Sequence, residues 1–233
     1  ATATDGNHGR GIAWTANKIG QKAKIFMPKG TTQERLKNIL KENADAAIYE
    51  LNYDDCVRYA DKYAKENNGV MVQDTSWKGY EKIPTWIMQG YLTMAYETYQ
   101  SIKMNGTLPT HIFLQAGVGS FAAAMTGFFI NIMKKNPPII ILVEPNKANC
   151  LFKTARINDG ELHSINGDLD SIMAGLCCGE PSSIAWDILS SYVNYFLSVD
   201  DKYAAHGMRV LGNPLEDDKK IISGESGAVT LGI

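Results

Sequence analysis

The sequence lacks a long apolar run, a strong charge of either sign and a dense set of cysteines. Its 233 residues carry a formal net charge of −2 at pH 7, which does not indicate a nucleic-acid or membrane partner. The four cysteines show neither the spacing of metal ligands nor the density of a disulfide framework. No stretch has the pattern of a signal peptide or a membrane span. We therefore expect a cytoplasmic protein with no metal site.

The remaining composition is that of an ordinary globular protein. Hydrophobic residues make up 45% of the chain and charged residues 21%, and 233 residues suffice for one large or two modest domains. The chain begins without Met, just before a glycine-rich turn, and stops inside a glycine-opened helical pattern. We expect both ends to be cuts through a longer fold.

Strand-like and helical patterns alternate along the whole chain. This alternation predicts parallel sheets with crossover helices, and thus an α/β fold. The main expected strands are 24–28, 47–51, 70–74, 111–114, 138–143 and 195–199, and the main expected helices are 31–43, 54–67, 84–103, 184–195 and 201–211.

The organisation of these elements predicts two domains. A complete alternating unit ends near residues 82–85, where a long helix leads into a second unit. We therefore expect a small α/β domain at 1–84 and part of a larger α/β domain at 85–233.

The most informative stretch is 4–11, which reads Thr-Asp-Gly-Asn-His-Gly-Arg-Gly and runs straight into a helical pattern. A glycine-dense turn at a helix start leaves backbone N–H groups free to bind an anionic or electron-rich ligand. Asn7 adds an amide donor, although asparagine is also a common turn residue. His8 is more simply explained by hydrogen bonds to nearby backbone, and Arg10 by solvent exposure.

A second glycine turn comprises Gly117, Val118, Gly119 and Ser120, between an apolar strand and another helix. It lacks the lysine of a Walker loop and the third glycine of a dinucleotide-binding fingerprint. A strand, a Gly-x-Gly-Ser turn and a helix N-terminus nevertheless form a phosphate cradle. The alternative is a tight turn that binds nothing.

Two aspartates are candidates for acid–base chemistry. Asp5 lies in the first glycine turn, and Asp74 ends the expected strand 70–74. Ligands of parallel sheets bind beyond the carboxyl ends of the strands, so both are expected at one functional rim. Buried carboxylates in such places often only cap helices. Cys177 and Cys178 are better explained as buried thiols than as nucleophiles.

Taken together, these motifs resemble the fold-type II pyridoxal-phosphate enzymes, which include threonine dehydratase and tryptophan synthase β, and most closely the diaminopropionate ammonia-lyases. The supporting motifs run nearly from end to end of the chain. They are Asp-Gly-Asn-His-Gly at 5–9, Gln-Asp-Thr-Ser-Trp-Lys-Gly-Tyr at 73–80, Gln-Ala-Gly-Val-Gly-Ser at 115–120, Val-Glu-Pro at 143–145, Met-Ala-Gly-Leu at 173–176 and Ser-Gly-Glu-Ser-Gly-Ala at 223–228.

The resemblance implies a cofactor and roles for the candidate residues. Pyridoxal 5′-phosphate would receive a bond from Asn7 to its 3′-oxygen, and the turn at 117–120 would hold its phosphate. Asp5 and Asp74 would match the two active-site aspartates of the ammonia-lyases. Asp5 would act as the base toward the D-substrate. The lysine that binds the cofactor covalently would lie outside residues 1–233.

The activity that the resemblance implies is elimination of ammonia from 2,3-diaminopropionate to give pyruvate, in a homodimer. Residues 1–233 alone are expected to be inactive. One alternative is a serine or threonine dehydratase on the same fold, and another is a non-catalytic fragment.

Overall fold

The computed structural model describes residues 1–233, which form two compact units, Ala1–Gln73 and Asp74–Ile233. The expected boundary between residues 84 and 85 falls instead in the first turn of helix α4 (Lys82–Met104). The segment that precedes this helix belongs to the second unit because Ser76 is hydrogen-bonded to Ser182 there. No helix has the length and apolar character needed to pass through a lipid bilayer.

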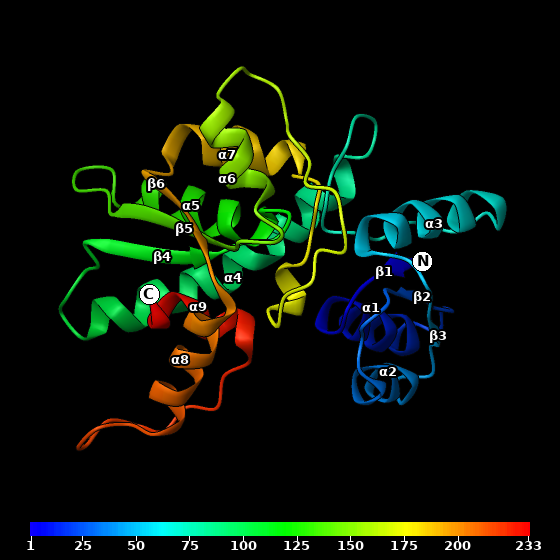
Figure 1. Ribbon diagram of the computed structural model, residues 1–233, viewed down its shortest axis with the longest axis horizontal. Coiled ribbons are helices and arrows are strands. Elements are labelled where there is room, and N and C mark those ends of the chain that lie inside the picture. The colour runs from blue at the N-terminus through cyan, green and yellow to red at the C-terminus, as the bar shows by residue number, and fades with distance from the viewer. The chain divides into compact units, whose positions relative to one another are not determined.

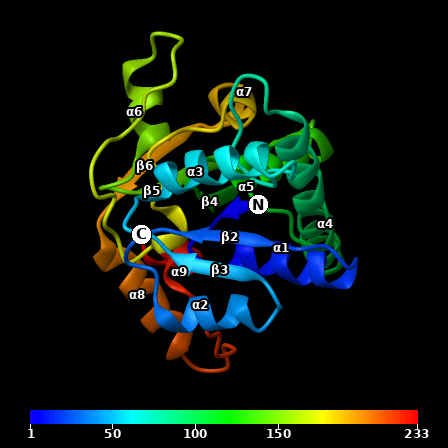
Figure 2. The same ribbon diagram turned by 90° about the vertical axis from the view of Figure 1, so that its right-hand side faces the viewer.

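The first unit is a three-stranded parallel sheet with helices on both faces. Strand β2 lies between β1 and β3. Figure 2 shows helix α3 on the opposite side of β2 and β3 from α2. The elements are β1 (Thr2–Ala3), α1 (Asn7–Lys18), β2 (Lys24–Met27), α2 (Gln33–Leu40), β3 (Asp45–Ile48) and α3 (Tyr53–Glu66).

Side-chain alternation along β2 builds the two layers of this unit. Ile25 and Met27 are fully buried in the apolar cluster that α1 and α2 cover. Phe26 points to the other face, where its ring lies 5.1 Å from Tyr59 and 5.5 Å from Tyr63 of α3, measured between centroids. The period of two along a strand therefore places aliphatic packing on one face and aromatic packing on the other.

The expected strand at 70–74 is wrong as a sheet strand, although the segment does run beside β1. Val72 N–H donates to the main-chain oxygen of Ala1 at 2.9 Å. At the next step the side chain of Gln73 replaces the main chain, because its Oε1 accepts from Ala3 N–H at 2.9 Å. Because a side-chain oxygen accepts from the Ala3 N–H of β1, the main-chain hydrogen-bond ladder ends there and no fourth strand forms.

The second unit contains another three-stranded parallel sheet, with β5 in the centre. The three strands expected here from the sequence are confirmed as β4 (His111–Gln115), β5 (Ile139–Pro145) and β6 (Tyr195–Val199). The helices are α4, α5 (Ser120–Ile132), α6 (Cys150–Ile157), α7 (Ser183–Tyr192), α8 (Asp201–Gly212) and α9 (Glu225–Gly232), with a 3-10 turn η1 (Ala174–Leu176).

Strand β5 is covered on both faces, as its continuous apolar run predicts. Ile140 and Leu142 are fully buried in the cluster formed with α4, α5 and α7. Val143 faces a second cluster with Ala204 of α8 and Val229 of α9. Figure 1 shows α7 on one side of the strands and α8 and α9 on the other. The carboxyl ends of β4 and β5 thus emerge from a rigid three-layer core.

Candidate active site

The glycine turn that follows β4 has the geometry of a strand-to-helix phosphate loop. Ala116 N–H continues the strand pairing by donating to Val143 O at 2.9 Å. Helix α5 begins at Ser120, and Gly119 before it has φ 102°, in the left-handed region. A residue with a side chain is strained in that conformation, so glycine is required here.

The backbone amides of this turn are free of protein acceptors. After Ala116, the next main-chain donor is Ala123, whose N–H bonds Gly119 O at 2.8 Å, and no N–H from residue 117 to 122 donates to a protein atom. Unpaired N–H groups at a helix N-terminus attract an anion through hydrogen bonds and the helix dipole. The turn therefore fits a phosphate group.

Gly117 is enclosed from behind by the chain around η1. A Cβ at this position would lie 3.0 Å from Cys178 Sγ and 3.3 Å from Gly175 O, so no larger residue fits without movement. The Cys150 thiol donates to Gly117 O at 3.8 Å. Cys150 and Cys178 therefore both approach Gly117, and all four cysteines are free.

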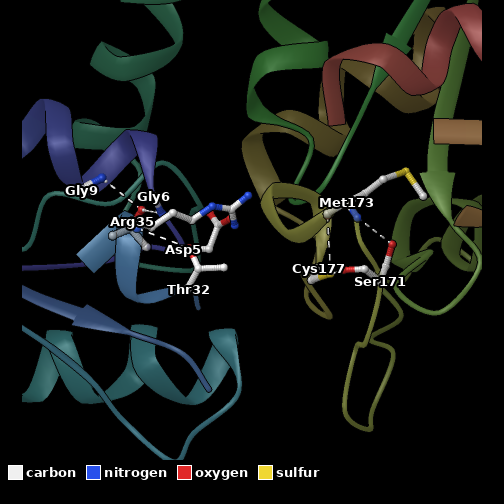
Figure 3. Close-up of polar contacts among 9 residues, drawn as sticks. Asp5, Gly6, Gly9, Thr32, Arg35, Ser171, Met173 and Cys177 are labelled. Atoms are coloured by element: carbon white, nitrogen blue, oxygen red, sulfur yellow. Dashed lines mark hydrogen bonds and ion pairs between the residues drawn. The ribbon is translucent and has the colours of Figure 1, made fainter. Parts of the chain in front are cut away.

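The segment that covers Gly117 is itself fixed by local hydrogen bonds, shown on the right of Figure 3. Ser171 Oγ accepts from Met173 N–H at 3.1 Å, and the Cys177 thiol donates to Met173 O at 3.6 Å. The Ser171 hydroxyl donates to Asp201 Oδ1 at the start of α8, at 2.5 Å. The wall of the loop is thus anchored to α8.

Glu144 lies at the end of β5 and caps α6. Its carboxylate oxygens accept from Leu151 N–H at 3.0 Å and Phe152 N–H at 2.6 Å. Burial raises the pKa of Glu144 from 4.5 to about 8, against the lowering effect of those amides and of Cys150. This carboxyl group is fully buried and therefore supports the loop from within the core.

Asp74 is hydrogen-bonded directly to the glycine turn at 117–120. The Ser120 hydroxyl donates to the main-chain oxygen of Asp74. Since this uses the only hydrogen of that hydroxyl, a phosphate here is held by amides. Burial and the neighbouring Asp74 carboxylate raise the pKa of Tyr91. The Tyr91 ring also contacts Phe121 of α5, with centroids 5.7 Å apart.

Asp5, in the first unit, forms an ion pair with Arg35. Arg35 Nη1 donates to Asp5 Oδ2 at 3.0 Å, and the Arg35 and Asp5 side chains are only 33% and 24% exposed, respectively. The left of Figure 3 shows this pair beside Gly6 and Thr32. Thr32 caps α2 by accepting from Arg35 N–H. The charged, half-buried Arg35 side chain fixes the orientation of Asp5.

The first glycine turn is organised by Thr4 rather than left with open amides. Thr4 Oγ1 accepts from Gly6 N–H at 2.9 Å and from Gly9 N–H at 3.1 Å. His8 Nε2 lies 3.0 Å from Val72 O, which confirms its structural explanation. Asn7 is exposed at the first position of α1 and its side chain makes no hydrogen bond to protein, so its amide is available to a ligand.

The predicted site residues therefore fall into two groups. Asp5 and Asn7 belong to the first unit, and Asp74 belongs to the second unit together with the loop at 117–120. The structure brings Asp74 to that loop. The expectation that Asp5 and Asp74 face one cleft stays a prediction. No group of three or more His, Cys, Asp or Glu residues is arranged to hold a metal ion.

Three supporting residues escaped the sequence analysis: Arg35, Ser76 and Tyr91. Arg35 lies in a capped amphipathic helix that carries no sign of its pairing with Asp5. The Ser-Ser pair at 182–183 after Pro181 is a helix-start signal, but it does not reveal the partner Ser76. Only the folded structure brings each of these residues to its partner.

Comparison with known proteins gives the family of the chain. The family model described as pyridoxal-phosphate dependent enzyme matches residues 1–233, and the chain belongs to this family. Its cofactor is accordingly pyridoxal phosphate, and its fold is that of the fold-type II enzymes, as expected from the sequence.

Curated relatives define the similarity more closely. The chain is 51% identical over 234 residues to the diaminopropionate ammonia-lyase of Salmonella typhimurium strain LT2, covering 100% of this chain and 58% of the relative. It is 48% identical to the Escherichia coli K12 enzyme of the same name, with the same coverage. The chain thus spans somewhat more than half the length of these relatives.

Solved structures agree with this similarity. The holo diaminopropionate ammonia lyase of Escherichia coli matches with a TM-score of 0.92 and 48% identity, covering 99% of this chain and 57% of the other. A maize serine racemase matches with a TM-score of 0.81 at 17% identity, covering 99% of this chain and 64% of the other. The second likeness concerns the fold alone.

Proposed function

We propose that the protein eliminates ammonia from 2,3-diaminopropionate, so that one substrate and one water give pyruvate and two ammonia molecules. The observation that carries the proposal is the bond from Ser120 to Asp74 O, which places a carboxylate-bearing residue directly at a turn of free amides. The identity of about half to diaminopropionate ammonia-lyases over the whole chain supports this substrate.

The residues present fit the cofactor of the family. The amides of Gly117, Val118, Gly119 and Ser120 would hold its phosphate, and the exposed amide of Asn7 would donate to a ring oxygen. When bound, pyridoxal phosphate withdraws electrons from the α-carbon of an amino acid and so makes its proton acidic. The fixed glycine turn orients the ligand without a conformational cost at the moment of reaction.

The two aspartates take the acid–base and electrostatic roles. A carboxylate accepts a proton at the α-carbon, and the Arg35 ion pair holds the Asp5 side chain in one orientation for this role. Diaminopropionate carries one more amino group than serine or threonine, so two carboxylates complement its charge. The Escherichia coli enzyme has been solved in complex with D-serine, which supports a small amino acid as ligand.

The decisive experiment is a product ratio measured on the whole protein as it is expressed. We expect two ammonia molecules for each pyruvate from diaminopropionate, and little turnover of serine or threonine. The competing function, a serine or threonine dehydratase, would release one ammonia for each oxo acid from the hydroxy amino acids. A 1:1 ratio with serine as the better substrate would overturn the proposal.

Three further statements complete the proposal. The enzyme works as a homodimer in the cytoplasm, and residues 1–233 by themselves do not turn over diaminopropionate. The four free cysteines support a reducing compartment. Light scattering of the whole protein, cell fractionation, and an activity assay on a chain of measured mass test these statements separately.

A further inference from the structure

A cluster of three serine hydroxyls joins the Asp74 segment to the start of α7. Ser76 Oγ lies 2.8 Å from Ser182 Oγ and 3.0 Å from Ser183 Oγ. Ile184 N–H donates to the same Ser76 oxygen at 3.1 Å. Ser76 is 4% exposed and Ser182 is fully buried, so water does not compete for these bonds.

The same turn is bonded to the phosphate loop. Ser182 N–H donates to Val118 O at 2.9 Å, in the middle of the glycine turn. Residues 182–184 therefore connect Ser76 on one side with the loop on the other. Because α7 also packs on α5 through Leu189 and the buried alanines, this connection is rigid.

Asp74 lies between two fixed points. Its main-chain oxygen accepts from the Ser120 hydroxyl, and two residues later Ser76 is held by the α7 turn. A hydroxyl donates one hydrogen and accepts two, and the three partners of Ser76 use this capacity completely. Ser76 has no hydrogen-bonding capacity left for a substrate, so it acts through the position of its neighbour.

We propose that Ser76 is a positioning residue that holds Asp74 at the phosphate loop. This inference rests on the proposed function for its effect on turnover. The bonds of Ser76 fix the segment that carries the carboxylate and leave the free amides of the loop untouched. Loss of the Ser76 hydroxyl therefore affects the chemical step more than cofactor affinity, since a small displacement of a catalytic group lowers the rate strongly.

The test compares Ser76→Ala with Ser191→Ala in the whole protein. Ser191 is an exposed serine near the end of the same helix α7, where it bonds only Asp187 O. For Ser76→Ala we expect kcat for diaminopropionate to fall about tenfold or more, with the Kd of pyridoxal phosphate changed by less than about threefold. Ser191→Ala should match the wild type in both.

Hydrogen exchange provides a readout that does not depend on activity. Exchange at residues 74–77, measured by mass spectrometry, should quicken about tenfold or more in Ser76→Ala and stay unchanged in Ser191→Ala. If the wild type does not convert diaminopropionate, the proposed function fails, and the exchange result alone then decides whether Ser76 holds the segment.

A milder variant keeps the proposal testable if Ser76→Ala does not fold. Ser183→Ala removes one partner of Ser76 at a half-buried position and should lower kcat about threefold with cofactor affinity retained. Wild-type kcat in both Ser76→Ala and Ser183→Ala would overturn the positioning role. So would a loss of cofactor affinity that equals the loss of kcat, because that result indicates a general structural role.

Discussion

The Ser120 hydroxyl donates a hydrogen bond to the main-chain oxygen of Asp74, so the first residue of α5 ties the backbone of the candidate catalytic Asp74 to the glycine turn at 117–120. This bond uses the backbone of Asp74 and leaves its side chain to other partners. A change confined to the Asp74 side chain should therefore separate catalysis from cofactor binding.

Asp74→Asn in the whole protein should lower kcat about 10²- to 10⁴-fold, because an amide cannot accept or carry the proton that a carboxylate does. The Kd of pyridoxal phosphate should stay within about threefold of the wild type, since the loop amides are unchanged. Steady-state kinetics and an absorbance titration measure the two quantities. Asp187→Asn, at an exposed position of α7, is the control. An equal loss in the control variant would show that the effect is not specific to Asp74.

Gly119→Ala should weaken cofactor binding. The new Cβ would lie 3.0 Å from Leu189 Cδ1 and 3.2 Å from Leu151 Cδ1, at a residue with φ +102°. We expect the Kd of pyridoxal phosphate to rise about tenfold or more, because the left-handed conformation costs about 1–2 kcal/mol with a side chain and the turn must shift. Gly127→Ala within α5, the helix that follows Gly119, meets only one atom, at 3.9 Å, and should stabilise the protein by up to about 1 kcal/mol. Unchanged affinity in Gly119→Ala would argue against phosphate binding at this turn.

Gly207→Ala should strongly destabilise the second unit. A Cβ at Gly207 would lie 2.1 Å from the main-chain oxygen of Ala228, where α8 and α9 cross closely. We expect the free energy of unfolding to fall by about 2–4 kcal/mol, as for other overpacked sites. Gly212→Ala, at the last residue of α8 with no atom within 4 Å, should change it little. Chemical denaturation of both variants measures these free energies of unfolding. Equal midpoints would contradict the close helix crossing.

Glu144 should make the stability fall as pH rises. Burial raises its folded-state pKa from 4.5 to about 8, so between these values the folded protein retains a proton that the unfolded chain has lost. The contribution is complete below pH 4.5 and is lost as pH rises through about 8, at a slope of at most about 1.4 kcal/mol per pH unit. Glu144→Gln should be less stable, because its NH₂ group faces an amide N–H, and should lose this slope. Denaturation at several pH values measures the sign of this pH dependence, with exposed Glu161→Gln as the control. If the slope persists in Glu144→Gln, the pH dependence belongs to another titrating group.

The cysteines should differ in reactivity toward an alkylating reagent. Burial, with a smaller effect of Asp55, raises the pKa of Cys56 to about 12, so at pH 8 about one thiol in 10⁴ is ionised. Cys177 is only half-buried. Mass spectrometry of the native protein should show Cys177 modified first and Cys56 protected, whereas all four should react after denaturation. Rapid native modification of Cys56 would contradict its burial in α3.

Much of the secondary structure could be predicted because it rests on local physics. The apolar run of β5 and the helical spacing of α4 are periodic patterns that bury one or both faces. The glycine turn at 117–120 was predicted correctly between a strand and a helix, since a Gly-x-Gly pattern at that place has few other uses. The segment 70–74 was misassigned, because its apolar residues favour an extended chain but do not reveal that the Gln73 side chain ends the pairing.

The sequence by itself determined the α/β alternation and the glycine turn at 117–120, because glycine conformation and apolar periodicity act over a few neighbouring residues, and it singled out the candidate aspartates. The tertiary structure alone decided which groups support them. Arg35 meets Asp5 across 30 residues, and Ser76 meets Ser182 across 106. These partners are polar residues of ordinary kinds whose pairing follows from the packing of whole helices and strands. No local sequence pattern predicts a hydrogen bond between residues so far apart in the chain, since its geometry is fixed only when the core has formed.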